Sequence, residues 1–393
     1  PNFNSECGNV WGYKGSTGDV DWSWDYHRMM DAFRRHPAIC GWLYTEHHDV
    51  INEWNGYWRY DRSEKFTGLE ELAAGMTLRD LHAPYYLAVG DAPCREVEAS
   101  SAVKVPLWAS IMAEIPGRGR RLIMRATLHG WDTLGRPRVW RTWAKDLRAT
   151  SWMSQAIEPL DVVMPDRSGL AVLAIALEEP TGLVLQRNFT TFLVTGGRDV
   201  GEKERLRLVR IDPKSFARAE WSVKQWNVLG GLKVNGAGAG FFEYRVPWPE
   251  DLDPAAVTGG AFVIEASAKQ LFGKDREGVP EIAGDFMRGK GTHDPSRNPN
   301  SYPMTDTDTY PSAVAIRVAG QAVGTFDLPD DPADHRGILS WHAQPQDGTL
   351  KEAGSYGYLL RAAVGPAALK RAAKAKEIVI RLEVDSSLPG GLA

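Results

Sequence analysis

The first 65 residues constrain the fold most, because they predict a strand, a helix and a second strand, with a carboxylate where the first strand ends. Residues 1–8 have the character of a strand end and carry Glu6. The apolar run 38–44 follows Pro37 and predicts a short buried strand. Between them, large apolar residues recur at three- and four-residue steps and predict one face of a helix: Trp22, Tyr26, Met29, Met30 and Phe33.

This order of elements is typical of the parallel unit of a TIM (β/α)8 barrel, and we expect residues 1–85 to be the C-terminal part of such a barrel. A last helix is expected over 70–81. Glu6 and Trp42 would then lie at the carboxyl ends of neighbouring strands, where such barrels carry out their chemistry. A carboxylate beside an aromatic wall suits the cleavage of a sugar. On spacing alone, a solvated or salt-bridged glutamate is the simpler interpretation of Glu6.

From about residue 95 the pattern changes to short alternating runs separated by Gly- and Pro-containing turns. It predicts an Ig-like β-sandwich over 95–198 and a jelly-roll-like (galactose-binding-like) β domain over 200–393. The strands expected in the first region are 103–112, 121–128, 139–144, 155–163, 170–177 and 183–194. Those expected in the second are 217–226, 240–246, 260–268, 313–318, 337–342, 357–363 and 377–384. A helix is expected over 367–376, and a long loop over 273–310.

Composition excludes some classes of partner. The formal net charge is −4, so a generally basic surface for nucleic acid is absent. No apolar run approaches the roughly 20 residues that a membrane helix needs. The 15 tryptophans fit both sugar sites and β-sandwich cores, and their number alone does not separate these uses.

Several short motifs of the first 65 residues resemble, in their order and spacing, the last quarter of the barrel of glycoside hydrolase family 2. They are Ser5-Glu6-Cys7-Gly8, Gly41-Trp42, Gly56, Tyr60-Asp61-Arg62 and Lys65. That family includes β-galactosidases, β-glucuronidases and β-mannosidases. The resemblance implies a retaining β-glycosidase in which Glu6 is the nucleophile and Trp42 lines the sugar subsite. It also implies that the acid/base residue lies on an earlier strand, outside this chain, so that the fragment is inactive alone.

Two departures from the family pattern bear on sugar specificity, one at Cys7 and one after the second strand, in Thr45-Glu46-His47-His48-Asp49. Cys7 stands where the family more often has an aromatic residue, and Glu46 and His47 join Trp11 as expected substrate contacts beside Trp42. We expect no cofactor and no metal. Adjacent side chains in His47-His48-Asp49 diverge, and Asp306 and Asp308 lack the spacing of a calcium loop, so we interpret them as turn residues. The Gly-rich run 230–240 is interpreted as a flexible turn.

Alternative functions remain open at this level. A non-catalytic carbohydrate-binding or structural β-sandwich module would make Glu6 incidental, whereas transglycosylation would use the same residues with a sugar acceptor in place of water. The expected partners are a carbohydrate substrate and the missing N-terminal part of the same polypeptide. A periplasmic or secreted location of bacterial type is favoured over the cytoplasm.

Overall fold

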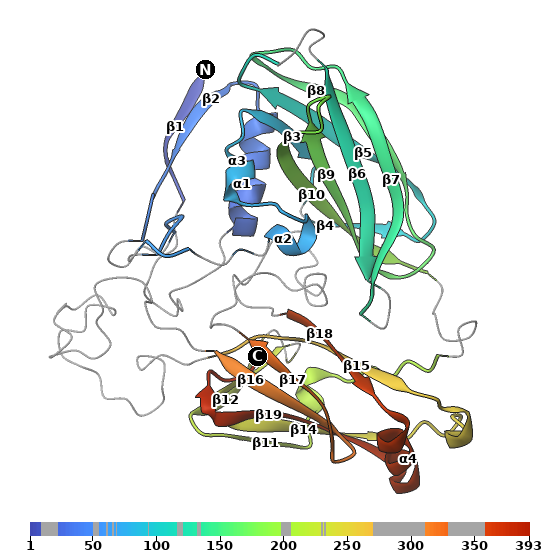
Figure 1. Cartoon of the computed structure of the whole chain (residues 1–393). Coiled ribbons are helices and arrows are strands. Elements are labelled where there is room, and N and C mark those ends of the chain that lie inside the picture. Colours follow the sequence, from blue (N-terminus) through green and yellow to red (C-terminus); the bar gives the residue numbers. More distant parts are fainter. Residues whose placement is uncertain are drawn as a thin grey trace, which may run out of the picture.

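The computed structural model is mostly β-sheet, in two layered bodies with a long helix beside the first (Figure 1). In it, no helix of the described residues is long and apolar enough to cross a membrane. The structure describes residues 1–8, 23–49, 55–59, 62–64, 67, 69–92, 94–115, 121–131, 135–197, 206–228, 231, 233–269, 311–328 and 358–393.

The predicted strand–helix–strand unit is confirmed as β1 (Asn2–Cys7), α1 (Ser23–Arg35) and β2 (Ile39–Tyr44). The two strands pair in parallel, with Asn4 opposite Trp42 and Cys7 opposite Tyr44. Helix α1 ends two residues before Pro37, because the residue that precedes a proline is disfavoured in helical geometry. Whether this unit belongs to a barrel stays a prediction.

The helix expected over 70–81 is instead two short helices, α2 (Leu69–Leu72) and α3 (Leu78–Leu81). Gly75 lies between them at φ +75°, a conformation that suits glycine and breaks the helix. The Asp80 carboxylate then accepts a 2.8 Å hydrogen bond from the backbone N–H of Thr77, which stabilises the first turn of α3.

The first β region is a sandwich. A sheet in the order β4-β10-β9-β6-β7 packs on a sheet in the order β3-β5-β8. The strands are β3 (Tyr85–Val89), β4 (Cys94–Glu98), β5 (Ala102–Ile111), β6 (Leu122–Trp131), β7 (Pro137–Leu147), β8 (Met153–Val163), β9 (Gly169–Glu178) and β10 (Val184–Thr195). The six strands predicted from sequence match β5 to β10 within a few residues. Because β3 belongs to the three-stranded sheet, the sandwich starts before residue 95.

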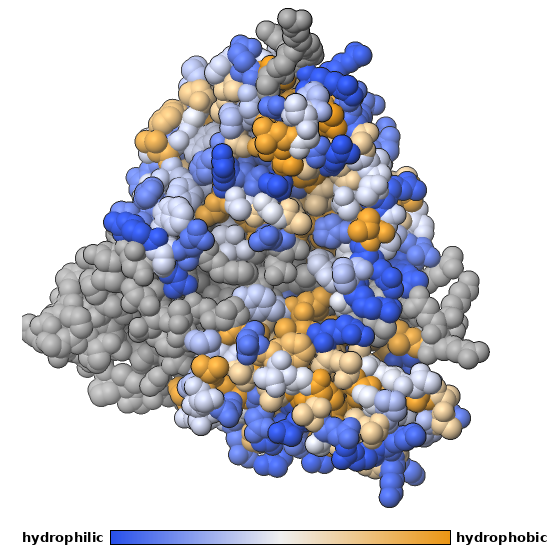
Figure 2. Space-filling model, viewed as in Figure 1, coloured by the Kyte–Doolittle hydropathy of each residue, from blue (hydrophilic) through white to orange (hydrophobic). Residues whose placement is uncertain are grey.

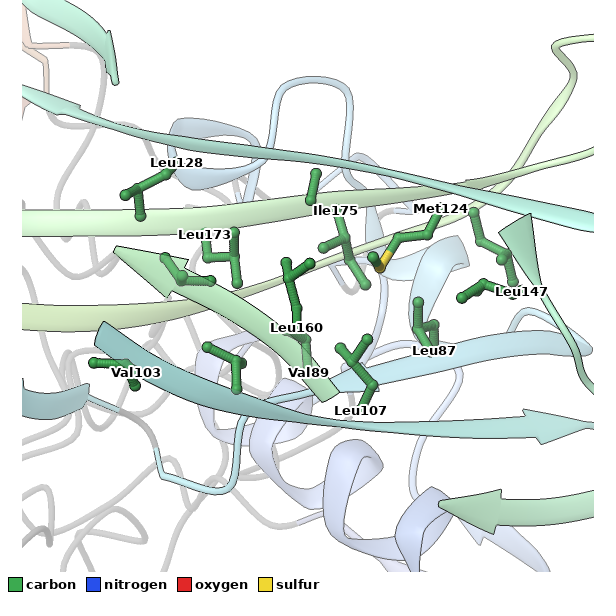
Figure 3. Packing of buried hydrophobic residues seen from close by; sticks show 14 of the residues in the cluster. Leu87, Val89, Val103, Leu107, Met124, Leu128, Leu147, Leu160, Leu173 and Ile175 are labelled. Atoms are coloured by element: carbon green, nitrogen blue, oxygen red, sulfur yellow. The ribbon is translucent and has the colours of Figure 1, made fainter. Parts of the chain in front are cut away.

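Alternation along each strand builds the core of this sandwich. On β5, Val103, Val105 and Leu107 are buried whereas Lys104 is exposed, which is the period-two pattern of a sheet with one face inward. Figure 3 shows the side chains of the two sheets meeting between them. The labelled members are Leu87, Val89, Val103, Leu107, Met124, Leu128, Leu147, Leu160, Leu173 and Ile175.

The second β region also forms layers around its own buried cluster. One sheet has the order β11-β14-β19-β16-β17, and β12–β13 and β15–β18 form two-stranded pairs. The elements are β11 (Arg218–Trp221), β12 (Lys224–Val228), β13 (Lys233–Ala237), β14 (Gly240–Pro247), β15 (Gly260–Ala266), β16 (Ser312–Val318), β17 (Gln321–Leu328), β18 (Tyr358–Val364), α4 (Pro366–Ala375) and β19 (Glu377–Pro389). The jelly-roll connectivity stays a prediction.

Two predictions in this region are wrong. The strand expected over 217–226 is two strands, β11 and β12, and the Gly-rich run 230–240 contains β13, which pairs with β12. The glycines are required by packing, since a Cβ on Gly236 would lie 2.0 Å from the Trp221 ring. The expected strand 337–342 and the loop 273–310, with Asp306 and Asp308, lie outside the described residues.

Candidate functional site

Glu6 lies one residue before the carboxyl end of β1, and its side chain is exposed. The ladder is irregular between Asn4 and Cys7, and the backbone N–H of Glu6 donates to Asn4 Oδ1 at 3.1 Å instead of continuing it. Cys7 is buried, and the N–H of Thr45 donates to its carbonyl at 2.8 Å, which holds the ends of β1 and β2 together. The structure thus puts Glu6 at the strand end, as predicted.

The two faces of the β1–β2 pair differ. Trp42 and Tyr44 pack with the cluster that includes Tyr26 and Met30 of α1. Phe3 and Leu43 are 55% and 57% exposed on the other face. Cys7 lies opposite Tyr44 and so shares its side of the pair, whereas Glu6 beside it is exposed.

Trp42 therefore lies on the helix side of the pair. The guanidinium carbon of Arg34 is 4.7 Å from its ring centroid, and the Phe33 ring is 6.0 Å away. Glu6 and Trp42 lie on neighbouring strands, but Trp42 packs against α1 whereas Glu6 is exposed. The role of Trp42 in sugar binding stays a prediction.

The segment after β2 turns back on itself. The backbone N–H of Tyr57 donates to the His47 carbonyl at 3.1 Å, and that of Asp49 donates to the Trp58 carbonyl at 3.0 Å. Asp49 is fully buried, and its Oδ1 accepts from the N–H of Gly56 at 2.9 Å. This pairing gives Asp49 a structural role.

Two further predicted substrate contacts, Glu46 and His47, lie at the start of the segment after β2. Glu46 is half-buried and His47 exposed, both directly after the carboxyl end of β2. Trp11 lies outside the described residues. Within the part of the chain that the structure describes, no three histidine, cysteine, aspartate or glutamate side chains are grouped so as to hold a metal ion.

An aromatic cluster beneath the strand ends was missed by sequence reasoning. The hydroxyl of Tyr26 on α1 lies 2.9 Å from that of Tyr57, and His82 Nε2 lies 2.9 Å from the first hydroxyl and 2.7 Å from the second. The Tyr44 ring packs 4.4 Å from Tyr26 and 4.7 Å from Tyr57. Tyr26 and Tyr44 were foreseeable as inward-facing residues, but no local signal marks His82.

Burial sets the protonation of this cluster. It raises the pKa of Tyr26, Tyr44 and Tyr57 far above the ordinary phenol value, so the hydroxyls stay protonated and can donate. Partial burial, and secondarily the charge of Arg34, lowers the pKa of His82, so its ring is neutral at pH 7. The cluster therefore holds the residues after β2 by uncharged hydrogen bonds.

A second buried network joins α1 to the sandwich. Asp31 Oδ1 accepts from the Tyr86 hydroxyl at 2.8 Å and from Asn188 Nδ2 at 2.9 Å. His27 Nε2 lies 3.6 Å from the other Asp31 oxygen and also contacts Asn188 Oδ1. All four side chains are less than a tenth exposed, so the network acts as a structural anchor for α1.

No protein-family model and no curated protein matches this chain. Solved structures give partial matches at low similarity. An exo-chitosanase of Amycolatopsis orientalis, in complex with PNP-β-D-glucosamine, is 8% identical over 88% of this chain and 31% of its own, with a TM-score of 0.28. A β-glucuronidase of Bacteroides uniformis is 11% identical over 99% and 41%, with a TM-score of 0.22.

The alkylpurine DNA glycosylase AlkC of Pseudomonas fluorescens is also 11% identical, over 27% of this chain and 30% of its own, with a TM-score of 0.20. The chain thus spans between about a third and two fifths of the length of these proteins. TM-scores of this size establish neither a shared fold nor an activity.

Proposed function

We propose that this chain is part of a retaining β-glycosidase that hydrolyses O-glycosidic bonds of a β-linked oligosaccharide or glycan, with Glu6 as the nucleophile. The observation that carries the proposal is the position of Glu6. It is an exposed carboxylate near the carboxyl end of a strand in a parallel, helix-connected pair. In an α/β barrel the carboxyl ends of the strands form the mouth, where catalytic residues lie.

The exposed apolar face of the pair supports a barrel. Parallel sheets are normally covered on both faces, yet Phe3 and Leu43 remain more than half exposed opposite α1. In a complete barrel these side chains would pack in its interior. The remaining strands, with the acid/base carboxyl about 5–5.5 Å from Glu6, would come from a segment outside this chain.

The chemistry has two steps. The Glu6 carboxylate attacks the anomeric carbon while the acid/base donates a proton to the departing oxygen, and the C–O bond to the leaving group breaks. The same acid/base then takes a proton from water, which attacks the anomeric carbon and releases Glu6 as a carboxylate. Neither step needs a cofactor. Trp11, Trp42, Glu46 and His47 are the proposed substrate contacts.

The test is Glu6→Gln in a full-length protein that contains this chain, assayed on aryl β-galactosides, β-glucuronides and β-mannosides. We expect kcat to fall by a factor on the order of 10⁴. Glu96→Gln, at an exposed position on β4, is the matched control and should leave kcat unchanged. A 2-fluoro glycoside should label the peptide that contains Glu6. Unchanged turnover of the Glu6→Gln protein would exclude Glu6 from the mechanism.

A carbohydrate-binding or structural module is the second candidate, and it is favoured by the two β bodies with separate buried clusters. It predicts oligosaccharide binding without hydrolysis in the full-length protein. Product analysis distinguishes the third possibility, because transglycosylation gives longer sugars where hydrolysis gives only free ones.

A further inference from the structure

Trp152 lies in the turn between β7 and β8, and it is 67% exposed. Its indole N–H donates to Glu114 Oε1 at 2.9 Å. In the same turn, Ser151 Oγ accepts from the backbone N–H of Ile115 at 3.0 Å. Two hydrogen bonds therefore tie this turn to the segment that follows β5, and they hold a flat aromatic ring in place at the surface.

The backbone at Trp152 is strained. Its φ is +58°, in the left-handed region where a bulky side chain is disfavoured and where glycine or asparagine is the usual residue. Burial of the ring does not compensate for this strain, because two thirds of the residue is exposed. Strain retained for an exposed side chain indicates that the ring serves something outside the fold.

The surroundings indicate the class of ligand. The exposed carboxylate of Glu114 contacts the indole, and the residue next to Trp152 in the chain, Met153, is apolar and 48% exposed. A protein partner would need a broader surface of some hundreds of Å². A pyranose ring needs one flat apolar surface for its C–H face and polar groups for its hydroxyls.

We propose that Trp152 and Glu114 form a carbohydrate-binding platform, distinct from the Glu6 site, that binds one pyranose ring of an oligosaccharide. Its assignment to a sugar rests in part on the proposed function. The pyranose ring would stack on the indole of Trp152, and the sugar hydroxyls would donate to the Glu114 carboxylate.

The platform lies at the opposite end of α1 from Glu6. Ser154, two residues after Trp152, donates from Oγ to the Arg34 carbonyl at 2.7 Å, which places this end of β8 beside the last turn of α1. Because α1 connects two parallel strands, it runs antiparallel to β1, and Glu6 lies near its start. The helix has 13 residues and is about 20 Å long. The platform would therefore hold a distant part of a long glycan.

The test measures binding of cellohexaose, chitohexaose and β-1,4-galactan to the full 393-residue chain by calorimetry and affinity electrophoresis. Saturable binding of at least one probe is expected. Trp152→Gly should keep or raise the melting temperature, since glycine suits the backbone, and should weaken binding roughly tenfold or more. Trp152→Phe should retain part of the affinity. Leu183→Ala, at a 59% exposed residue of the same sandwich, is the control and should bind normally.

Equal affinity of the Trp152→Gly chain, or no saturable binding of any probe, would overturn the platform. Self-association lost in the Trp152→Gly chain would also overturn it, in favour of an interface between copies. The test is separate from that of Glu6. A Glu6→Gln chain is expected to bind oligosaccharide normally. If binding depends on Trp152 but Glu6→Gln leaves kcat unchanged, the platform is upheld and the proposed glycosidase mechanism is rejected.

Discussion

The guanidinium of Arg34 packs against the indole of Trp42, with 4.7 Å between its central carbon and the ring centroid. It also lies 4.9 Å from the Tyr86 ring, and its Nη2 donates to the Ala83 carbonyl at 2.9 Å. Arg34 is only 2% exposed, and burial lowers its pKa to about 10, so it is still charged at neutral pH. One buried cation thus links α1, β2 and the first strand of the sandwich.

Substitution of Arg34 should separate loss of volume from loss of charge. Arg34→Ala leaves a cavity and an unsatisfied carbonyl at Ala83, and we expect the free energy of unfolding to fall by about 3 kcal/mol. Arg34→Met fills the space without burying a charge, so its cost should be about half as large. Urea denaturation measures both, with exposed Arg148→Ala as the control. Equal losses in the Ala and Met variants would contradict this account.

The His82 cluster predicts a pH dependence of stability. Its folded pKa is below the ordinary 6.5, so the folded state favours the neutral ring, whose Nε2 lies within hydrogen-bonding distance of the Tyr26 and Tyr57 hydroxyls. The contribution is complete above pH 6.5 and is lost as the pH falls through the lowered folded pKa. Unfolding midpoints from pH 8 to pH 5 should fall more steeply for the wild type than for His82→Gln. Parallel profiles would show that His82 is not responsible.

The Asp31 network should be among the costliest polar sites to disrupt. Asp31→Ala leaves the buried Tyr86 hydroxyl without its acceptor and removes one of the acceptors of the Asn188 amide, and we expect a loss of about 3 kcal/mol. Tyr86→Phe removes one hydrogen bond and should cost about 1–2 kcal/mol. Chemical denaturation provides the values. Asp31→Ala and Tyr86→Phe should be non-additive in the double variant, and strict additivity would mean that the two groups do not interact.

A pair of glycine substitutions tests close packing against backbone strain. Gly90 has φ +77°, and a Cβ there would lie 2.6 Å from Thr190 Oγ1, whereas Gly182 has φ +89° with nothing within 4 Å. Gly182→Ala should cost about 1 kcal/mol from the backbone alone. Gly90→Ala should cost at least about 2 kcal/mol, because strain and overlap add. Equal melting temperatures for the two variants would show that Thr190 moves aside freely.

Part of the candidate site around Glu6 was predictable from sequence, because the patterns that mark it involve residues close together in the chain. Glu6 lies near the end of a short strand, Tyr26 and Met30 recur at helical spacing, and Pro37 stops the helix before the next apolar run. The face to which each side chain points was not predictable. A single irregularity between Asn4 and Cys7 breaks the alternation of β1, so that Asn4 and Cys7 both lie opposite residues of β2 that face α1.

The sequence by itself determined the parallel strand–helix–strand unit and most strands of the first sandwich, because period-two and period-3.6 patterns are properties of neighbouring residues. The tertiary structure decided what depends on distant partners. It paired β13, which lies in the Gly-rich run 230–240, with β12, brought His82 to Tyr26 across 56 residues, and packed Trp42 against Arg34. Those contacts join elements far apart in the chain, and no local pattern encodes which distant side chain will fill a given space.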